Sequence, residues 1–171
     1  MTLAQGLVED IAQTLEEVGL NPQSLILEIS ENALMQNTEA TIRKLHQLHA
    51  LGVRLAVDDF GADYTSLSHV QRFPLDILKI DKSFIRGVET DSRQSSLVHA
   101  IIALGRALDL EIVAEGVDLA TQVERLRQLG CDQGQGCHFA KPLSSYEMEL
   151  LLKVRAPLAA RRARSVPSTS R

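Results

Sequence analysis

The chain has 171 residues, of which 44% are hydrophobic and 23% are charged, as is typical of a globular domain with a buried core. This composition excludes a chain that is disordered as a whole, a collagen-like fibre and a membrane bundle. No apolar run approaches the ~20 residues that a membrane helix needs. The first residues also lack the basic and apolar segments of a signal peptide, so we expect a cytoplasmic protein.

Charge is distributed unevenly along the chain, whose net charge is −4. Five arginines and no acidic residue lie in residues 155–171, so the rest of the chain is markedly acidic. An acidic body argues against DNA or RNA as a partner, because binding a nucleic-acid polymer needs a basic surface. We therefore expect a domain at residues 1–154, followed by a basic, disordered tail at residues 155–171 that could contact anions nonspecifically.

The periodicity of the apolar residues predicts short strands that alternate with helices. In chain order we expect a helix at 3–18, a strand at 25–29, a helix from about 37 to 51, strands at 53–57 and 77–80, a helix at 92–108, a strand at 112–114, a helix at 119–129, a weak strand at 132–135 and a helix at 145–154. This alternation predicts an α/β fold with a parallel sheet, which is either an open sheet or a closed barrel.

Each predicted strand ends, at its carboxyl side, in charged or amide side chains. They are Glu28 with Glu31, Asp58 with Asp59, Lys79 with Asp81, Glu115, and Gln135. Helix capping explains a single acid after a strand, but it explains five such positions in series poorly. In a (β/α)8 barrel these strand ends meet at one mouth, where catalytic groups sit, so the series favours a barrel.

A cluster of carboxylates needs cations to balance its charge. Hard oxygen ligands without suitably spaced Cys or His favour Mg²⁺ or Mn²⁺ over Zn²⁺. The adjacent pair Asp58 and Asp59 is the natural centre of a two-metal site, provided that Asp59 already lies in the turn after the strand. Lys79 adds a positive charge for a phosphate or an attacking water, although a plain ion pair with Asp81 or another acid is the alternative. Together these residues predict metal-assisted hydrolysis of a phosphoester.

Two other sequence patterns suggest a kinase motif and a zinc site, but neither is supported by the rest of the chain. Asp58-Asp59-Phe60-Gly61 contains the Asp-Phe-Gly of protein kinases, but the chain lacks their Gly-rich loop and their catalytic loop. Cys131 and Cys137 lack the paired spacing of a zinc site, so we interpret them as structural thiols.

Five segments in order resemble the motifs of one family. Leu27–Glu31 resembles its Glu-x-Thr-Glu motif, Asp58–Leu67 its Asp-Asp-Phe-Gly loop, Leu78–Ile85 its Leu-Lys-Ile-Asp signature, Ala114–Asp118 its Ala-Glu-Gly-Val-Glu motif, and Gln135–Pro142 its Gln-Gly-Tyr-x-Phe-x-Lys-Pro motif. The family is that of the EAL domains. The resemblance implies a (β/α)8 TIM-barrel-like fold and a bacterial enzyme that hydrolyses cyclic di-GMP to linear pGpG with Mg²⁺ or Mn²⁺.

The resemblance also implies roles for individual residues. Glu28, Asp58, Asp59 and Glu115 would be metal ligands, and Lys79, Glu115 and Gln135 would be catalytic. Glu31 would anchor the loop after Asp59, which couples metal binding to dimer contacts, and Tyr64 and Ser66 would belong to that loop. Asp81 and Pro142 would bind the substrate.

The chain departs from the family pattern in several places. Asp63 replaces a glycine of the Asp-Asp-Phe-Gly loop, and Cys137 replaces a tyrosine. The Glu-x-Leu-x-Arg motif that names the family does not occur, nor does the strand with a metal-binding Asn that follows it. We therefore expect the C-terminal part of an EAL domain, with about five of eight strands and the N-terminal strands missing.

Two expectations follow from these departures, and two alternatives stay open. Hydrolysis by the isolated chain should be impaired, and the chain should form a homodimer or bind a complementing N-terminal fragment. The alternative in the binding class is a catalytically inactive module that binds cyclic di-GMP or a protein partner. A weaker alternative is a different metal-dependent barrel enzyme, such as one that acts on enolates.

Overall fold

The computed structural model describes residues 6–35, 39–61 and 71–162, with the backbone alone at residues 35 and 154–162. The chain divides into two compact units, Met1–Phe139 and Ala140–Arg171. The first unit holds the whole sheet, and the second holds the last helix.

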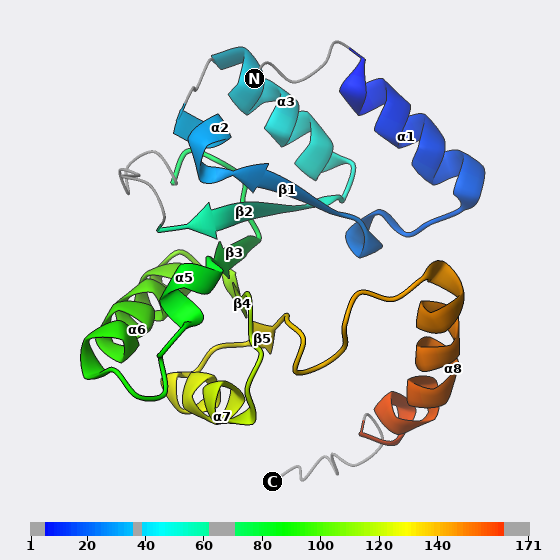
Figure 1. Ribbon diagram of the computed structural model, residues 1–171. Helices are drawn as coiled ribbons and strands as arrows, with labels where there is room; N and C mark the ends of the chain where they lie inside the picture. Colours follow the sequence, from blue (N-terminus) through cyan, green and yellow to red (C-terminus); the bar gives the residue numbers. More distant parts are fainter. Residues whose placement is uncertain (1–5, 36–38, 62–70, 163–171) are drawn as a thin grey trace, which may run out of the picture. The chain divides into compact units, whose positions relative to one another are not determined.

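Strands and helices alternate along the first unit (Figure 1). The elements are α1 (Leu7–Val18), η1 (Pro22–Ser24), β1 (Ile26–Ser30), α2 (Glu31–Met35), α3 (Glu39–Ala50), β2 (Arg54–Phe60), β3 (Ile77–Ile80), α5 (Lys82–Ile85), α6 (Ser92–Ala107), β4 (Glu111–Ala114), α7 (Ala120–Leu129) and β5 (Gln133–Gly134). The second unit contains α8 (Ser145–Arg162). The sequence explains several of these boundaries, because the Asp91 side chain caps α6 and glycines in the left-handed conformation end α1 and α7.

The five strands form one sheet in the order β1-β2-β3-β4-β5, and every neighbouring pair is parallel. Helices α3 and α6 pack against the strands, and α1 packs against α3. The apolar side chains of the central strands are fully buried in the core beneath these helices, among them Leu55, Val57, Leu78, Ile80 and Ile112. The predicted parallel α/β sheet is confirmed.

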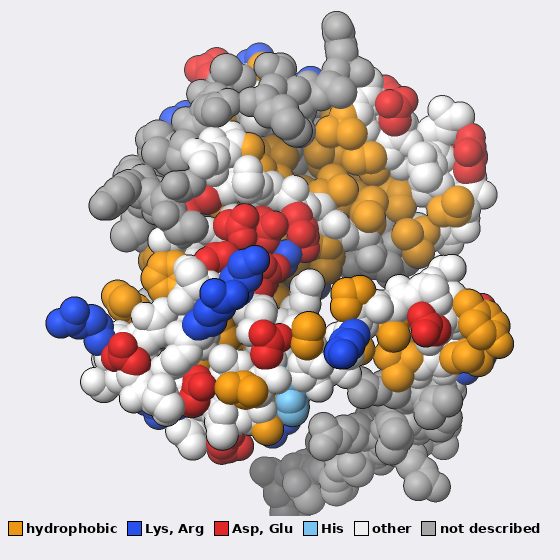
Figure 2. All heavy atoms as spheres, viewed as in Figure 1, with side chains coloured by type: hydrophobic (Ala, Val, Ile, Leu, Met, Phe, Trp, Pro, Cys, Tyr) orange, Lys and Arg blue, Asp and Glu red, His pale blue; other side chains and the backbone are white. Residues whose placement is uncertain are grey.

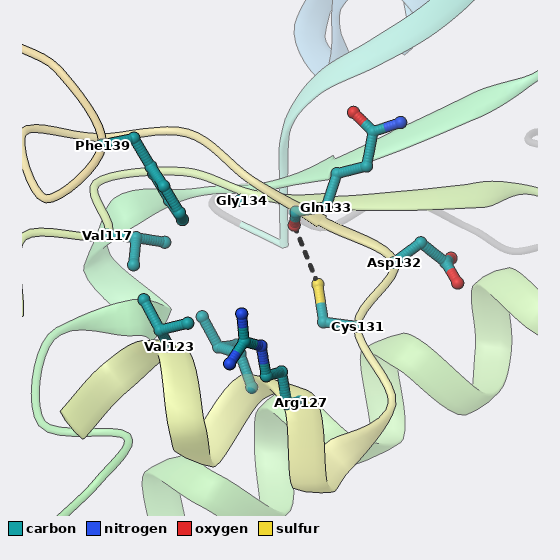
Figure 3. Close-up of a pocket in the computed structure, with 9 residues that line it drawn as sticks. Val117, Val123, Arg127, Cys131, Asp132, Gln133, Gly134 and Phe139 are labelled. Carbon is teal, nitrogen blue, oxygen red and sulfur yellow. Dashed lines mark hydrogen bonds between the residues drawn. The ribbon is translucent and has the colours of Figure 1, made fainter. Parts of the chain in front are cut away.

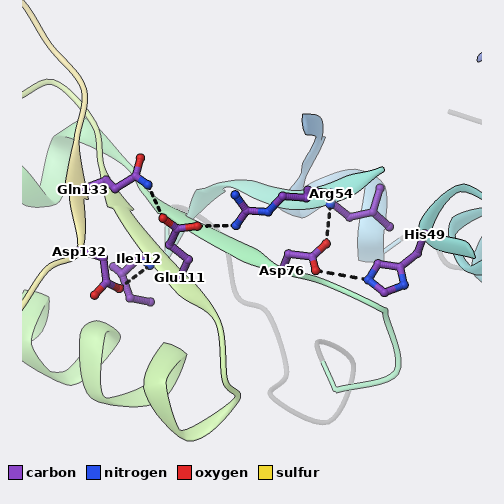
Figure 4. Close-up of polar contacts among 8 residues, drawn as sticks. His49, Arg54, Asp76, Glu111, Ile112, Asp132 and Gln133 are labelled. Carbon is purple, nitrogen blue, oxygen red and sulfur yellow. Dashed lines mark hydrogen bonds and ion pairs between the residues drawn. The ribbon is translucent and has the colours of Figure 1, made fainter. Parts of the chain in front are cut away.

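Charged side chains link the amino ends of the strands (Figure 4). The Arg54 guanidinium on β2 forms an ion pair with Glu111 on β4, and Glu111 also accepts a hydrogen bond from Gln133 on β5. The Asp76 carboxylate accepts a hydrogen bond from the Leu55 backbone N–H (2.8 Å). These contacts lie at the end of the sheet opposite to the predicted site.

The ends of two elements differ from those predicted, and three short elements are additional. Strand β2 runs to Phe60 rather than ending at residue 57, and the short elements η1, α2 and α5 were not predicted. The last helix runs to Arg162 rather than ending near residue 154, because Ala156, Ala159 and Ala160 favour helix. Residues 155–162 of the predicted tail are thus helical, and the remainder of that tail lies outside the described residues.

Among the described residues, no helix combines the length and apolar character that crossing a membrane requires.

The core predicts a contrast between two leucines. Leu78 on β3 is fully buried, and a Cβ on Gly105 of α6 would lie 3.6 Å from its Cδ1, whereas Leu97 on α6 is 46% exposed. We expect Leu78→Ala to lower the free energy of unfolding by about 2–5 kcal/mol, because it leaves a cavity between strand and helix. Leu97→Ala should change it by about 0.5 kcal/mol or less. Urea denaturation measures both values, and equal losses would contradict this packing.

Candidate functional site

A lysine and three carboxylates meet at the carboxyl ends of the strands. Lys79 Nζ on β3 lies 2.6 Å from Glu28 Oε1 on β1, 2.9 Å from Asp58 Oδ1 on β2 and 2.5 Å from Glu115 Oε1 directly after β4. Figure 2 shows acidic side chains gathered beside basic ones on this face of the molecule. Parallel pairing brings these residues together although 87 positions of sequence numbering separate Glu28 from Glu115, because their strands end at one edge.

Asp58 and Asp59 reach the same site because strand β2 is irregular at this point. The register with β3 shifts between Val57 and Phe60, and Asp59 has a positive φ of 56°. In a regular strand the two carboxylates would point to opposite faces. The bulge lets both carboxylates reach the same face although Asp59 lies within β2. From the sequence we predict this arrangement only with Asp59 in the turn after the strand.

Three of these carboxylates form a cluster that could hold a metal ion. Asp58, Asp59 and Glu115 each offer one oxygen, and these oxygens lie within 4.8 Å of one another. Asp58 Oδ1 is buried and, among the described residues, has the ion pair with Lys79 but no well-aligned hydrogen bond. Carboxylate oxygens are the ligands that Mg²⁺ and Mn²⁺ prefer, so the residues present fit a divalent cation of this kind.

Lys79 is the cation that the chain itself supplies to this cluster, and its side chain is 6% exposed. Burial by itself lowers the pKa of Lys79, but the contacts with the three carboxylates outweigh that effect and hold the pKa above its ordinary value. The ammonium group is therefore charged at neutral pH. It offsets part of the repulsion among the carboxylates.

Two further acids border the cluster. Glu31, the first residue of α2, is 2% exposed, and its Oε2 accepts a hydrogen bond from the Gly61 backbone N–H (2.9 Å). The Asp81 carboxylate caps α5 by accepting a hydrogen bond from the Ser83 backbone N–H (2.9 Å). Desolvation and the nearby charges of Asp58 and Asp81 raise the pKa of Asp59.

The remaining predicted site residues are placed less closely. Gln135 directly follows β5, and its backbone N–H donates to the Ala114 carbonyl oxygen (2.8 Å). Tyr64 and Ser66 lie outside the described residues. Pro142 belongs to the second compact unit, so it is not placed relative to the carboxylates.

Two cavities lie at the outer strands of the sheet. One of about 420 Å³ adjoins the cluster, with Glu28, Ser30 and Asp58 among its lining residues. A smaller one of about 160 Å³ lies between α7 and β5, and Figure 3 shows Cys131 with Arg127 and Phe139 around it. Desolvation raises the pKa of the Cys131 thiol to about 11, and the thiol donates to the Gln133 carbonyl oxygen (3.2 Å). This thiol is thus kept protonated, as expected of a structural cysteine.

A sequence model of the EAL domain matches residues 2–142. The chain belongs to the EAL domain family. Among curated proteins, this EAL domain is 42% identical over 147 residues to the cyclic di-GMP phosphodiesterase NbdA of Pseudomonas aeruginosa, covering 86% of the chain and 19% of NbdA. The chain thus spans about a fifth of the length of this relative.

Solved EAL structures resemble this chain as well. The phosphodiesterase MucR of Pseudomonas aeruginosa in complex with c-di-GMP matches with a TM-score of 0.78 and 42% identity. The match covers 84% of this chain and 58% of the MucR chain in that structure. The manganese and cy-diGMP complex of BlrP1 from Klebsiella pneumoniae matches with a TM-score of 0.74 and 29% identity. The match covers 79% of this chain and 34% of the BlrP1 chain in that structure. The five parallel strands therefore correspond to part of the TIM-barrel-like EAL fold.

Sequence reasoning gave no role to Gly116, Asp118 or Gly136, which lie in the loops that follow β4 and β5. The available signal was their position, because each lies one to three residues after Glu115 or Gln135. Their contacts become visible only in the folded chain.

The ion pairs of Lys79 predict how metal and stability are linked. We expect Lys79→Met to lower the free energy of unfolding in EDTA by about 1–3 kcal/mol. The loss stays below that of breaking a fully buried ion pair, because the carboxylates that lose their partner are partly exposed to water. Because folding raises the pKa of Lys79, this contribution is complete below the ordinary lysine value of 10.5 and is lost as the pH rises beyond it.

Urea denaturation at pH 8, with and without Mn²⁺, measures this effect. Mn²⁺ should reduce the difference in free energy of unfolding between Lys79→Met and the unaltered chain, because the metal supplies the missing positive charge. Lys82→Met is the matched control, since Lys82 is exposed three residues further along the chain. An equal loss in the two variants would show that the ion pairs of Lys79 contribute nothing specific.

Proposed function

We propose that this EAL domain binds cyclic di-GMP and hydrolyses it to linear pGpG with Mg²⁺ or Mn²⁺. The observation that carries the proposal is the convergence of Asp58, Asp59 and Glu115 within 4.8 Å, with Lys79 in contact with two of them. The similarity to NbdA, named a cyclic di-GMP phosphodiesterase, supports the choice of substrate.

In this proposal Glu28, Asp58, Asp59 and Glu115 hold two metal ions. Bound there, the metals would polarise the phosphate and lower the pKa of a bound water. The manganese complex of BlrP1 supports a divalent cation, and the all-oxygen donor set favours Mg²⁺ or Mn²⁺.

The chain's own groups position the substrate and the water. Lys79 is charged and fixed by its contacts, so it can bind a phosphate oxygen or orient the attacking water. Hydrolysis forms one bond from phosphorus to the water oxygen and breaks the bond from phosphorus to a ribose 3′ oxygen. The leaving 3′ oxygen takes up the proton that the water loses and becomes a hydroxyl group. Gln135 after β5 would help to hold the water, and Asp81 and Pro142 would contact the substrate.

A loop would complete the site in the same proposal. The hydrogen bond between Glu31 and the Gly61 N–H ties the start of α2 to the residue that follows Phe60 at the end of β2. Tyr64 and Ser66 follow Gly61 in sequence and belong to the loop that this bond would anchor. We further propose that the protein works in the cytoplasm, because its two cysteines are free, as is usual in a reducing compartment.

A second candidate function is binding of cyclic di-GMP without hydrolysis. The absence of a Glu-x-Leu-x-Arg segment from the 171 residues favours this reading for the isolated chain. The same absence leads us to propose that turnover by the isolated chain is weak.

A comparison of two glutamates at opposite ends of β4 tests the function. Glu115 follows the carboxyl end of β4 at the cluster, whereas Glu111 lies at its amino end. We expect slow release of pGpG with Mn²⁺, lowered by at least about 100-fold in Glu115→Gln, since this variant loses a metal ligand. Glu111→Gln should retain the rate of the unaltered chain.

Chromatography of the nucleotide products measures this rate, and calorimetry measures binding. Rapid turnover that Glu115→Gln leaves intact would contradict the assignment. Binding of cyclic di-GMP without any pGpG would favour the binding module instead.

We also propose that the chain forms a homodimer or takes up a chain that supplies further strands. Strands β1 and β5 each pair on one side among the described residues, and Ile26 on β1 is 43% exposed. Unpaired backbone groups at an exposed strand edge favour pairing with another chain. We expect light scattering to give the mass of two chains, and a compact, stable monomer would contradict this proposal.

A further inference from the structure

Three glycines lie next to the residues of the candidate site. Gly61 follows Asp59 by two positions, Gly116 directly follows Glu115, and Gly136 directly follows Gln135. At each of the three, a Cβ atom would come within 3.0 Å or less of a neighbouring segment, which is helix α5 for Gly61 and Gly116 and the loop after β4 for Gly136. Their contacts thus connect the loops after β2, β4 and β5 and the helix that follows β3.

The two closest contacts involve atoms that cannot easily move. A Cβ on Gly136 would lie 2.3 Å from the Val117 carbonyl oxygen and 2.4 Å from its backbone nitrogen. A Cβ on Gly116 would lie 2.6 Å from the Cβ of Lys82, at the start of α5. Gly116 also has a φ of +64°, which side-chain-bearing residues rarely adopt.

Hydrogen bonds hold the same loops together. The Val117 N–H donates to the Gln135 carbonyl oxygen (3.0 Å), and the His138 N–H donates to the Val117 carbonyl oxygen (3.1 Å). Asp118 Oδ1 accepts from the Cys137 N–H (3.2 Å). Val117 itself is fully buried, so the two loops are packed backbone against backbone.

We propose that Gly116 and Gly136 are positioning residues of the site. Their missing side chains let the loop after β4 lie directly against α5 on one side and against the loop after β5 on the other. This loop interlock, formed by the contacts Gly116–Lys82 and Gly136–Val117, fixes Glu115 and Gln135 relative to Lys79 on β3. The contact of Gly61 with the Phe84 ring, 3.0 Å from a Cβ on Gly61, extends the arrangement to the loop after β2. The inference rests on the proposed function for the roles of the residues that it positions.

Gly136→Ala is the decisive variant because Gly136 does not have a positive φ, so the close contact alone makes alanine unfavourable. Gly134→Ala is its matched control two residues earlier. The three atoms nearest to a Cβ on Gly134 all belong to side chains: two lie in the Phe139 ring, the nearer at 3.1 Å, and the third is Val117 Cγ2 at an ordinary contact distance of 3.4 Å. The Phe139 side chain is 43% exposed, so it can shift to admit the methyl group.

Amide hydrogen exchange in EDTA reports the interlock without metal or substrate. We expect Gly136→Ala to speed exchange of the Val117 and Gln135 amides about tenfold, because overpacking displaces the Val117 backbone. Exchange of the amides in the centre of the sheet should stay as in the unaltered chain, and Gly134→Ala should change none of these rates more than about twofold. Unchanged exchange at Val117 and Gln135 in Gly136→Ala would overturn the proposal.

Binding of Mn²⁺, followed by electron paramagnetic resonance, reports the consequence for the site. We expect Gly136→Ala to weaken Mn²⁺ binding about tenfold and Gly134→Ala to leave it within about twofold. Equal Mn²⁺ affinity in Gly136→Ala and the unaltered chain would overturn the positioning role. If the unaltered chain bound no Mn²⁺, the metal site of the proposed function would be contradicted, while the exchange rates would still decide whether the interlock exists.

A second pair of variants decides the matter if Gly136→Ala unfolds the chain, which would appear as faster exchange throughout the sheet. Asp118→Ala removes the hydrogen bond to the Cys137 N–H without adding volume, and Asp118→Asn retains the accepting oxygen. We expect Asp118→Ala to speed exchange of the Cys137 and His138 amides and to weaken Mn²⁺ binding, and Asp118→Asn to restore both. The proposal would be overturned if Asp118→Ala showed the same amide exchange rates and the same Mn²⁺ affinity as the unaltered chain.

Discussion

The repulsion among carboxylates at one end of the sheet is the constraint that shapes this molecule. Glu28, Asp58 and Glu115 come from three different strands, and parallel pairing forces their strand ends to one edge. A cluster of this kind is stable only with positive charge in its midst. The buried ammonium of Lys79 supplies one such charge from the chain itself, and the remaining negative charge is what makes the site attractive to divalent cations.

Local backbone irregularity then determines which oxygens face that charge. The bulge at Asp58 and Asp59 in strand β2, with its positive φ, places two neighbouring carboxylates on the same side. A non-glycine residue in this conformation is uncommon, and such strain tends to occur at functional sites. Among the described residues Asp59 and Asp109 adopt it, and Asp59 is one of the three residues that form the carboxylate cluster.

Much of the fold could be predicted from the sequence, because apolar alternation and strand-end residues are local signals. The strand at 77–80 shows this well, since its bounds agree with β3 and the structure places Lys79 at the cluster. The β2 bulge could not be predicted, because a register shift depends on the partner strand. The helical extent of α8 was missed for a different reason, since a short basic segment rich in Ala, Ser and Pro without an apolar stripe indicates an unstructured tail, whereas its alanines also favour helix. The contacts of Gly136 with Val117 connect segments 19 positions apart in the numbering, so sequence spacing alone gave no sign of them.

The ion pair between Arg54 and Glu111 at the amino ends of the strands has a consequence for how the sheet can assemble. Sliding one parallel strand by a single residue turns every side chain to the opposite face. In β4 such a slip would carry Glu111 away from Arg54 at one end and Glu115 away from Lys79 at the other. Misaligned assemblies thus leave charges unpaired at both ends of β4, so charge pairing adds to the alternating burial of this strand in selecting against wrong registers.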